Sequence, residues 1–547
     1  AGLDPHRSRI RLVQLHAGQT TYVVDMFVVP WAALSGLWGC SLVAHNAVFE
    51  MKHLLHVGVD VALIDCTMLQ ANALGEGLPS LAKACLKHLG VEVSKDEQTS
   101  DWGAAVLTHE QLTYATNDAR LVWQLHRRLA EKLARSKHRT QCYALMRDSQ
   151  RAVARMELEG FGFDKPAHHQ WTQELEQAHQ QAREAVSEHL GVDVNPDSAP
   201  QLAQWIKPHL TKDDLAAWPH TKTKQLETSA DVLAQWTHPA AAALCDYKKL
   251  AKQCSSFGNS LAKHCNPVTG RLHASFRLAG ARTGRMSCNR PNLQQAPRST
   301  AFRQLFVAPP GRRLVVADFS QIELRVAAAL SGDERMLAAY ANGEDLHRQT
   351  AAALMDIEPK AVTSEQRQRA KAVNFGLLFG QGAPGLREYA RDSYGVDLTL
   401  DEAEQYRSTF LETYKRLALW QQSTVKAARH SLRSVTVGGR IRDYRAEDDK
   451  RPYTKSLNTP VQGAAGELLM VAMTLLETEL RTLDAALVNV VHDELVVECA
   501  EDCTAEVTAL LEQCMTNAWL RLFPDHPALT RDLVEAHVGA NWAEAKG

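Results

Sequence analysis

The sequence has no excess of charge of either sign, no long hydrophobic run and no cysteine pattern. Its 61 Lys and Arg residues nearly balance 63 Asp and Glu residues, for a formal net charge of −2, so bulk charge does not point to nucleic acid or to a membrane surface. No apolar run approaches the roughly 18 residues of a membrane span, and the opening AGLDPHRSRI lacks a signal-peptide core. The eleven cysteines form no Cys-x-x-Cys pair, which argues against a zinc ribbon and for reduced thiols. These absences predict a cytoplasmic protein without a membrane partner.

What the sequence does contain is enough chain for several hydrophobic cores. At about 150 residues per domain, 547 residues predict roughly three to four domains. Hydrophobic residues make up 45% and charged residues 23%, a balance typical of globular proteins that excludes wholesale disorder. The first residue is Ala rather than Met, as expected of a trimmed product or a fragment.

The pattern of apolar residues changes twice along the chain. Residues 1–147 alternate short apolar runs such as TYVVDMFVV with helical stretches, which is typical of an α/β unit. Residues 148–265 have a helical pattern with few strand signals. From Asn266 onward, strand-like runs return among long amphipathic helices, of which the clearest are Ser364 to Phe379 and Ala464 to Leu480.

A local excess of positive charge lies between residues 277 and 313. Eight arginines and no acidic residue occur in this segment. Arginine binds phosphate and base-edge acceptors through its planar fork, so the segment is a candidate docking surface for a nucleic-acid backbone. The alternative is a solvated loop whose charge is balanced by acids from elsewhere in the chain. The eight are Arg277, Arg282, Arg285, Arg290, Arg298, Arg303, Arg312 and Arg313.

Acidic residues follow buried strands at two places in the C-terminal half. In RLVVADFSQIELR, the apolar run LVVA predicts a buried strand that ends at Asp318, before a helix. In ALVNVVHDELVVE, two apolar runs flank His492, Asp493 and Glu494, which predicts a β-hairpin with the two acids at its tip. Alternatively, Asp318 caps the helix that begins near Ser320, and the hairpin turn is merely polar.

Carboxylates that lie side by side repel each other unless cations separate them. A pair of magnesium ions about 3.5–4 Å apart removes that repulsion, activates an attacking hydroxyl and stabilises a leaving phosphate. If the strand end and the hairpin tip meet, these acids are therefore suited to phosphoryl transfer.

A helical stripe lies between the two acidic segments, in TSEQRQRAKAVNFGLLFGQG. Two cations and two phenylalanines recur every four residues, so they share one slowly turning face of a helix. Such a face can hold a triphosphate at its cationic end and stack on a sugar or base at its aromatic end. The alternative is an amphipathic helix with Phe in the core and solvated cations. The four residues are Arg367, Lys371, Phe375 and Phe379.

In their order and spacing, these segments resemble the motifs of the family A DNA polymerases, the bacterial and phage polymerase I type. TGRMSCNRPNLQQAP resembles the primer-template contact motif, and DFSQIELR, RQRAKAVNFGLLFG and VVHDELVVE resemble motifs A, B and C. The ending VGANWAEAKG also resembles the C-terminus of that family. The resemblance covers nearly the whole chain and implies a template-directed DNA polymerase that extends a primer with deoxynucleoside triphosphates, in replication or repair.

The resemblance also implies an α/β and α+β multidomain fold. A ribonuclease H-like 3′–5′ exonuclease domain is expected over residues 1–147, followed by a right-hand polymerase. The thumb is expected at 148–275, the palm at 276–334 and 431–547, and the fingers at 335–430. The implied partner is primer-template DNA. The implied state is a monomer, with or without replication accessory proteins, in the bacterial cytosol or a phage-infected cell.

Roles for individual residues follow from the resemblance. Asp318 and Asp493 are expected to hold two Mg²⁺ ions, or Mn²⁺ as a substitute, with Glu494 as a supporting acid, while the primer 3′-hydroxyl attacks the α-phosphate. Glu323 matches the steric gate that favours deoxynucleotides. The expected nucleotide-binding residues are Gln321, Glu323, His347, Arg367, Lys371, Phe375 and Phe379, and the expected DNA-binding residues are Arg285, Asn292, Gln294, Asn458, Gln462 and His492.

The sequence departs from the family pattern at two of these places. Phe379 stands where many relatives have Tyr, so hydrogen bonds of that hydroxyl do not carry over. Thr454, with Lys455 beside it, stands at a position that is often Arg, so the corresponding DNA contact does not carry over.

The N-terminal segment resembles the exonuclease only in part. VAHNAVFEMKHL resembles the second exonuclease motif and YATNDARLVWQL the third, which implies exonuclease-like roles for Asn46, Glu50, Tyr114 and Asp118. The first motif, Asp-x-Glu, is absent before LDPHRSRIRLVQL, and Glu50 stands where the second motif normally has Asp. A longer side chain shifts the geometry of a bound metal, so we expect weak or no proofreading from this chain.

Three other functions are alternatives to the DNA polymerase. A 3′–5′ nuclease would keep its activity in Asp493→Ala and lose it in Asp118→Ala. A catalytically silent primer-template binder fits the arginine-rich segment and would incorporate no nucleotide. A single-subunit RNA polymerase shares the palm chemistry, but Glu323 and the primer-contact segment argue against it.

Overall fold

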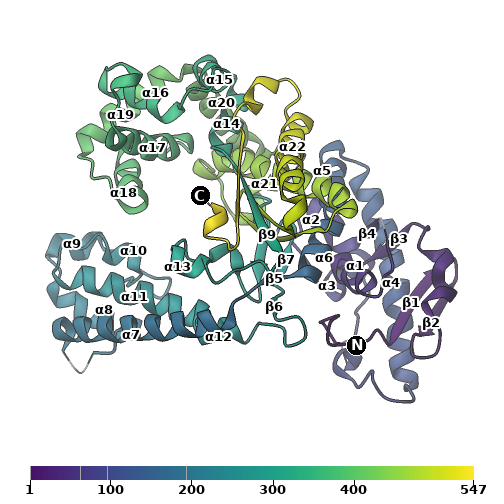
Figure 1. Cartoon of the computed structure of the whole chain (residues 1–547). Helices are drawn as coiled ribbons and strands as arrows, with labels where there is room; N and C mark the ends of the chain where they lie inside the picture. The colour runs from purple at the N-terminus through teal and green to yellow at the C-terminus, as the bar shows by residue number, and fades with distance from the viewer. Residues whose placement is uncertain (1, 62, 95, 192–193, 547) are drawn as a thin grey trace.

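The computed structural model describes residues 2–61, 63–94, 96–191 and 194–546. Figure 1 shows a central sheet with two helical lobes on one side of it and an N-terminal α/β lobe on the other. One hydrophobic core runs from the N-terminal lobe through the sheet into the lobe of helices α15–α20, whereas the second helical lobe, which we call the arm, has its own core.

The N-terminal lobe confirms the predicted α/β unit. Its longest helix, α4 (His109–Leu133), begins with a capping box between Thr108 and Gln111 and buries leucines at a spacing of four. β1 and β2 pair antiparallel, and β3 and β4 pair parallel. The elements other than α4 are β1 (Leu12–Ala17), β2 (Thr20–Asp25), β3 (Leu42–Ala44), α1 (Ala47–His56), β4 (Ile64–Cys66), α2 (Thr67–Ala73), α3 (Leu81–Leu89), α5 (Lys137–Asp148) and α6 (Gln150–Glu159).

The arm consists of two long helices and four short ones. Helices α7 (Lys165–Leu190) and α11 (Ala240–Phe257) pack along each other, as the helical pattern of this region predicts. Trp218 and Trp236 are buried in the separate hydrophobic core of the arm. The short helices are α8 (Ala199–Ile206), α9 (Lys212–Ala217), α10 (Ala230–Leu233) and α12 (Asn259–Ala262).

The other helical lobe, α15–α20, is built around α17 (Ser364–Leu378), which matches the predicted helix to within one residue. It starts with a capping box between Thr363 and Gln366, and it packs against α16 and α18. The lobe comprises α15 (Glu334–Ala341), α16 (Leu346–Met355), α17, α18 (Ala383–Tyr394), α19 (Leu400–Thr413) and α20 (Lys415–Ser431).

The central sheet has four antiparallel strands in the order β12-β13-β9-β14. The predicted strands are present as β9 (Arg312–Phe319), β12 (Ala485–Val491) and β13 (Glu494–Ala500), and the sequence pattern did not indicate β14 (Val534–Gly539). Helix α22 contacts three of these strands. The remaining elements of this region are α14 (Ile322–Ser331), α22 (Thr504–Leu522), α13 (Thr300–Arg303), and the short strands β5 (Phe161–Gly162), β6 (Arg271–Leu272), β7 (Ser275–Arg277), β8 (Ser287–Asn289), β10 (Arg433–Val435) and β11 (Ile441–Asp443).

Helix α21 (Thr454–Glu479) begins ten residues before the predicted start at Ala464. The prediction was late because Pro460, which usually ends or kinks a helix, lies inside it. Within the described residues, the stretch 454–482 is long and apolar enough to cross a membrane by length and composition alone, but 83% of its most apolar window is buried inside the protein. It is a core helix, and Gln462 and Glu467 interrupt what would otherwise be a continuous apolar run.

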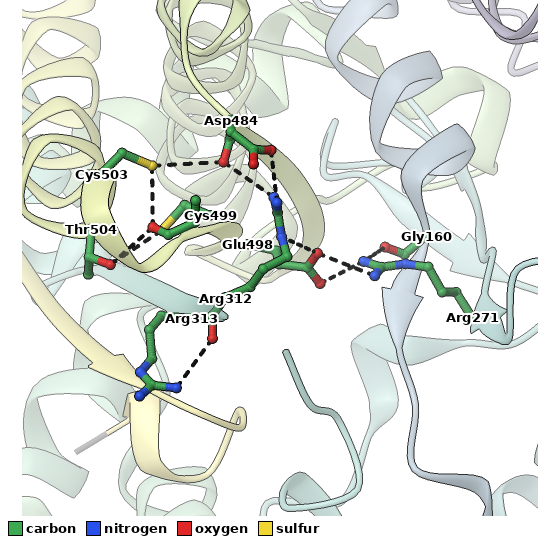
Figure 2. A network of polar contacts seen from close by, with 10 residues as sticks. Gly160, Arg271, Arg312, Arg313, Asp484, Glu498, Cys499, Cys503 and Thr504 are labelled. Carbon is green, nitrogen blue, oxygen red and sulfur yellow. Dashed lines mark hydrogen bonds and ion pairs between the residues drawn. The ribbon is translucent and has the colours of Figure 1, made fainter. Parts of the chain in front are cut away.

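A network of charges joins the base of the arm to the sheet (Figure 2). Glu498 of β13 accepts hydrogen bonds from Nη2 of Arg271 at 2.8 Å and from Nε of Arg312 at 3.0 Å. Arg312 also donates to Asp484, at 2.8 Å, and Arg271 donates to the carbonyl of Gly160, at 2.9 Å. Glu498 is 6% exposed, so a buried carboxylate holds two arginines from distant parts of the chain.

Candidate active site

The two predicted acidic segments meet at one edge of the central sheet. In the antiparallel pair β9 and β13, Asp318 lies opposite Glu494, and the main-chain N–H of Phe319 donates to the carbonyl of Asp493 across 3.3 Å. The hairpin between β12 and β13 turns at His492, whose φ is +57°. The predicted hairpin, which brings Asp493 and Glu494 beside Asp318, is therefore confirmed.

Asp318 does not cap the helix that follows it. The N-cap residue of α14 is Gln321, which has a φ of +52° and makes no side-chain capping bond. Its Oε1 instead accepts a hydrogen bond from the hydroxyl of Tyr340 at 3.1 Å. The alternative in which Asp318 caps this helix is therefore wrong. Asp318 lies at the end of strand β9 where the two acidic segments meet.

The two aspartates fit divalent ions electrostatically. Burial, and then the charge of Asp318, raises the pKa of Asp493 to about 7, so the two carboxylates are close enough to repel each other in an enclosed place. Divalent cations remove such repulsion. The described residues contain no group of three or more His, Cys, Asp or Glu side chains arranged for a metal.

The C-terminal tail brings a lysine to the same acids. Nζ of Lys546 lies 2.6 Å from Oδ2 of Asp318 and 2.5 Å from Oε2 of Glu494. The indole N–H of Trp542 donates to the other oxygen of Glu494, Oε1, across 2.6 Å. The sequence analysis did not identify Lys546 or Trp542 as site residues. Both lie in the ending VGANWAEAKG, whose resemblance to the C-terminus of the family is the sequence feature that could have indicated them.

Helix α17 carries the cationic and aromatic stripe. Nε of Arg367 lies 2.5 Å from Oδ2 of Asp345, so this cation is already paired. Lys371 is half-buried and has no ion pair among the described residues. Phe375 and Phe379 are partly buried against the large core, which leaves an edge of each ring accessible beside the cations.

The structure places His347 differently from the predicted contact with the incoming triphosphate. It is 1% exposed, its Nδ1 accepts a hydrogen bond from the amide of Asn374 at 2.8 Å, and its ring centroid lies 5.9 Å from that of Phe375. Burial lowers the pKa of His347 to about 4, so the ring is neutral at pH 7. His347 lies on α16, and its ring packs against Asn374 and Phe375 of α17.

Glu323, the predicted steric gate, is ion-paired with Arg285, a predicted DNA contact. Glu323 lies in the first turn of α14. Arg285 passes close to Gly466 of α21, where a Cβ would lie 3.3 Å from the Cα of Arg285, so glycine permits the approach. In the chain without DNA, the predicted steric gate Glu323 and the predicted DNA contact Arg285 therefore bind each other.

The other predicted DNA contacts lie on three elements. Asn458 and Gln462 are four residues apart on α21 and so share a face, and His492 is exposed at the hairpin turn. Asn292 and Gln294 lie at and within a 3₁₀ helix (Leu293–Gln295) that contacts β12. The side-chain oxygens of Asn292 and Asn458 are buried and accept no hydrogen bond from the described residues.

Only part of the arginine-rich segment is without acidic partners. Arg277, Arg290 and Arg298 are exposed and form no ion pair with the residues described, whereas Arg303 lies over the ring of Trp542 at 4.8 Å. The expectation of unbalanced charge is wrong for four arginines, because acids from distant segments reach them. These four arginines form five ion pairs: Arg282 with Glu447, Arg285 with Glu323, Arg312 with Asp484 and Glu498, and Arg313 with Glu501.

The structure does not bring the exonuclease-like residues to one site. Asn46, at the N-cap of α1 with a φ of +71°, lines a cavity of about 680 Å³. Tyr114 and Asp118 of α4 line a different cavity of about 500 Å³. Oε2 of Glu50 is buried without a hydrogen-bond partner among the described residues, and burial raises the pKa of Glu50 to about 8. Glu50 lines neither of the two cavities.

Comparisons with known proteins agree with this geometry. The family described as "DNA polymerase family A" matches residues 165–544, and that described as "3'-5' exonuclease" matches residues 1–134. The chain is 32% identical to DNA polymerase I of Aquifex aeolicus over 98% of this chain and 94% of that protein. It is 33% identical to DNA polymerase I of Chloroflexus aurantiacus over 92% of this chain and 54% of that protein, so it spans about half the length of this second relative.

A solved structure resembles the chain over nearly its whole length. It is described as the POL domain of Pol1 from M. smegmatis in complex with DNA primer-template and dNTP, and it has a TM-score of 0.81 and 26% sequence identity over 96% of this chain and 91% of that one. The named relatives are bacterial enzymes, and none of them supports a phage origin. The chain belongs to DNA polymerase family A and carries a 3′–5′ exonuclease-type domain before its polymerase region.

Proposed function

We propose that this polymerase adds deoxynucleotides to a primer 3′-hydroxyl on a DNA template and that Asp318 and Asp493 hold the divalent ions it needs. The observation that supports this most directly is the meeting of the two aspartates at one sheet edge, where the pKa of Asp493 is raised. We infer Mg²⁺, with Mn²⁺ as a substitute, because oxygen ligands and a phosphate substrate suit both ions. Bound there, the ions would activate the primer 3′-hydroxyl and stabilise the charge of the reacting phosphate.

Helix α17 provides the proposed nucleotide site. Lys371 binds the triphosphate, and Arg367 joins it once the phosphates compete with Asp345 for the guanidinium. Phe375 lies against the sugar and Phe379 against the base. These assignments are supported by the shared helix face and by the half-buried rings beside the cations. In this proposal His347 acts through α17, since its ring is enclosed.

The proposed partner is primer-template DNA, the ligand named for the M. smegmatis relative. Arg277, Arg290 and Arg298 provide exposed positive charge for its phosphates. We infer a monomer because one chain supplies the acids, α17 and the arginines. The bacterial relatives point to the bacterial cytosol as its place of action.

We assign the lobes to the parts of a polymerase hand. The arm corresponds to the thumb at 148–275, the α15–α20 lobe to the fingers at 335–430, and the central sheet with its helices to the palm at 276–334 and 431–547. The assignment is supported by the separate core of the arm and by the position of the acids on the sheet. Residues 1–147 form the exonuclease-type domain.

We propose that this exonuclease-type domain degrades DNA weakly or not at all in this chain. Asn46 lies in a different cavity from Tyr114 and Asp118, and Oε2 of Glu50 is buried without a hydrogen-bond partner among the described residues. The test is release of the 3′-terminal nucleotide from labelled single-stranded DNA with Mg²⁺ and with Mn²⁺. Release that is rapid and lost in Asp118→Ala would contradict the proposal and favour a proofreading enzyme.

Single-turnover extension of a labelled primer-template tests the polymerase site. The wild type should add the templated deoxynucleotide, and Asp493→Ala should reduce the rate by at least about 10³-fold, since a group that stabilises the reacting phosphate is lost. Asp484→Ala removes an exposed acid of the same sheet region and should extend normally. Tight DNA binding without any extension by the wild type would favour the silent-binder alternative.

A further inference from the structure

We propose that Lys546 is a resident cation of the polymerase site, which holds Asp318 when no divalent ion is present and which the incoming ion displaces. The proposal deepens the proposed function and rests on it, because it takes Asp318 as an ion ligand. It gives the C-terminal tail a role in setting the ion affinity of the free enzyme.

The contacts of Lys546 place a positive charge between two acids. Its ammonium lies 2.6 Å from Asp318 and 2.5 Å from Glu494, which face each other across β9 and β13. Such charge-assisted contacts remove the repulsion that the carboxylates would otherwise exert on each other. Because one oxygen of Asp318 is bound to the ammonium, an ion that needs Asp318 competes with Lys546 for it.

Glu494 is engaged on both sides by the protein. Its Oε2 contacts Lys546 and its Oε1 accepts the indole N–H of Trp542 at 2.6 Å. With an exposed fraction of 3%, it presents no unpaired oxygen to an ion. In the free chain we therefore assign to Glu494, which the family resemblance implies as a supporting acid, the role of a positioning residue for Lys546.

The tail is held in place at Trp542. Its main-chain N–H donates to the carbonyl of Phe306 at 2.8 Å, its ring packs at 5.8 Å from that of Phe161, and the guanidinium of Arg303 lies over it. Trp542 is 1% exposed. The lysine four residues later is therefore attached to a fixed part of the fold.

The last turn before Lys546 is also closed by its own hydrogen bonds. The carboxylate of Glu544 accepts from the N–H of Ala540 at 2.9 Å and from the amide of Asn541 at 2.7 Å. Ala545 is fully buried, and a Cβ at Gly539 would lie 2.5 Å from its nitrogen. Only the side chain of Lys546 has to move when an ion replaces it at Asp318.

A titration of the full-length chain with Mn²⁺, without DNA or nucleotide, tests the proposal. Free Mn²⁺ is followed by its electron paramagnetic resonance signal, which disappears on binding. Removing a charge that repels the ion should tighten binding, so we expect Lys546→Gln to lower the Mn²⁺ dissociation constant by about tenfold. Lys546→Arg keeps the charge, and Lys263→Gln removes an exposed lysine of the arm. Both should stay within about twofold of the wild type, by the same reasoning.

The Asp318→Asn variant separates this inference from the proposed function. If Asp318→Asn abolishes the Mn²⁺ site but Lys546→Gln leaves its affinity unchanged or weaker, the ion site stands and the role of Lys546 is overturned. If the site survives Asp318→Asn, both are overturned.

Lysine labelling of the wild type provides a test that needs no substitution. With an amine-reactive reagent and mass spectrometry, saturating Mn²⁺ should increase the modification of Lys546 several-fold and leave Lys263 unchanged. Equal or lower modification of Lys546 with the ion bound would overturn the displacement.

Discussion

Glu467 shows how strongly a single residue of this polymerase depends on its surroundings. It lies on α21 with 2% exposure, and it accepts hydrogen bonds from the hydroxyl of Thr436 and from the N–H of Gly438, the latter at 2.8 Å. Burial nevertheless raises the pKa of Glu467 to about 7. Two accepted hydrogen bonds therefore do not offset the cost of burying the charged form of Glu467.

Stability should therefore fall with pH in a range set by Glu467. Its pKa is raised on folding from 4.5 to about 7, so the folded chain binds the proton more tightly. The stabilisation is fully present below pH 4.5, is lost as the pH rises towards 7 by up to about 1.4 kcal/mol per unit, and stays lost above it. Melting temperatures of wild type and Glu467→Gln should be similar at pH 5 and diverge towards pH 8, where the variant is the more stable. Parallel pH profiles would contradict this.

A second prediction at the residue scale concerns sugar selection. Glu323 lies in the first turn of α14 and is paired with Arg285. Shortening it in Glu323→Ala should open space near the 2′ position and raise ribonucleotide incorporation relative to deoxynucleotide by at least about tenfold in kcat/KM. Single-nucleotide addition with matched dNTP and rNTP measures the ratio. Glu334→Ala, on the neighbouring helix α15, serves as the control.

Individual residues differ in how well the sequence predicts them. Asp318 and Asp493 could be found because local apolar runs define the strands that present them. Lys546 could not, since its contact with Asp318 depends on the docking of β14 and the tail more than two hundred residues away. The pairing of Arg367 with Asp345 was hidden for the same reason, as it requires α16 to pack on α17.

Among the elements, α17 ends in a turn that only glycine fits. Gly380 has a φ of +74°, and a Cβ there would lie 2.6 Å from Cδ1 of Leu457 and 3.2 Å from the ring of Tyr453. Gly382, two residues later, has an ordinary φ of −77°. Its Cβ would meet only Pro384, at 3.8 Å.

We expect Gly380→Ala to destabilise the end of α17 and Gly382→Ala to be nearly neutral. The left-handed conformation alone costs alanine about 1–2 kcal/mol, and Leu457 must also move. The first variant should melt at lower temperature and bind the incoming nucleotide more weakly, because Phe379 precedes the turn. Nucleotide titrations in single-turnover extension measure the nucleotide affinity of both variants. Equal losses of affinity in the two variants would contradict the steric explanation for Gly380.

The charged network at β13 predicts a contrast between two acids of the same cluster. Glu498→Ala leaves Arg271 and Arg312 without their buried carboxylate and should cost about 3 kcal/mol. Asp484→Ala removes a partner whose side chain is 72% exposed and should cost less than about 1 kcal/mol. Thermal melts of the two variants measure the difference, and similar losses would mean that the network is not energetically centred on Glu498.

Elements were predictable where their pattern was local. The hairpin and α17 followed from apolar runs and from a four-residue period, and both are present. β14 was missed although its apolar and polar residues alternate, because it is short and five of its six residues are only partly buried or exposed. The start of α21 was missed because Pro460 suggested a break that the surrounding core overrides.

Across the whole molecule, a nearly neutral chain concentrates its usable positive charge in a few places. Arg277, Arg290 and Arg298 are exposed without an ion pair among the residues described, whereas Arg313 is paired with Glu501. DNA affinity should therefore fall with salt, and the slope of log K against log salt should shrink by about 1 in Arg298→Ala. Arg313→Ala should leave the slope unchanged. Fluorescence anisotropy with a primer-template over a range of salt concentrations measures both slopes.

The order of strands in the central sheet also has a consequence for biosynthesis. β9 is an inner strand of the sheet, but both of its neighbours, β13 and β14, come much later in the chain. A nascent chain that has emerged from the ribosome only as far as α21 therefore has Asp318 on a strand with no partner on either side. The sheet around Asp318 can close only after β13 and β14 have emerged as well.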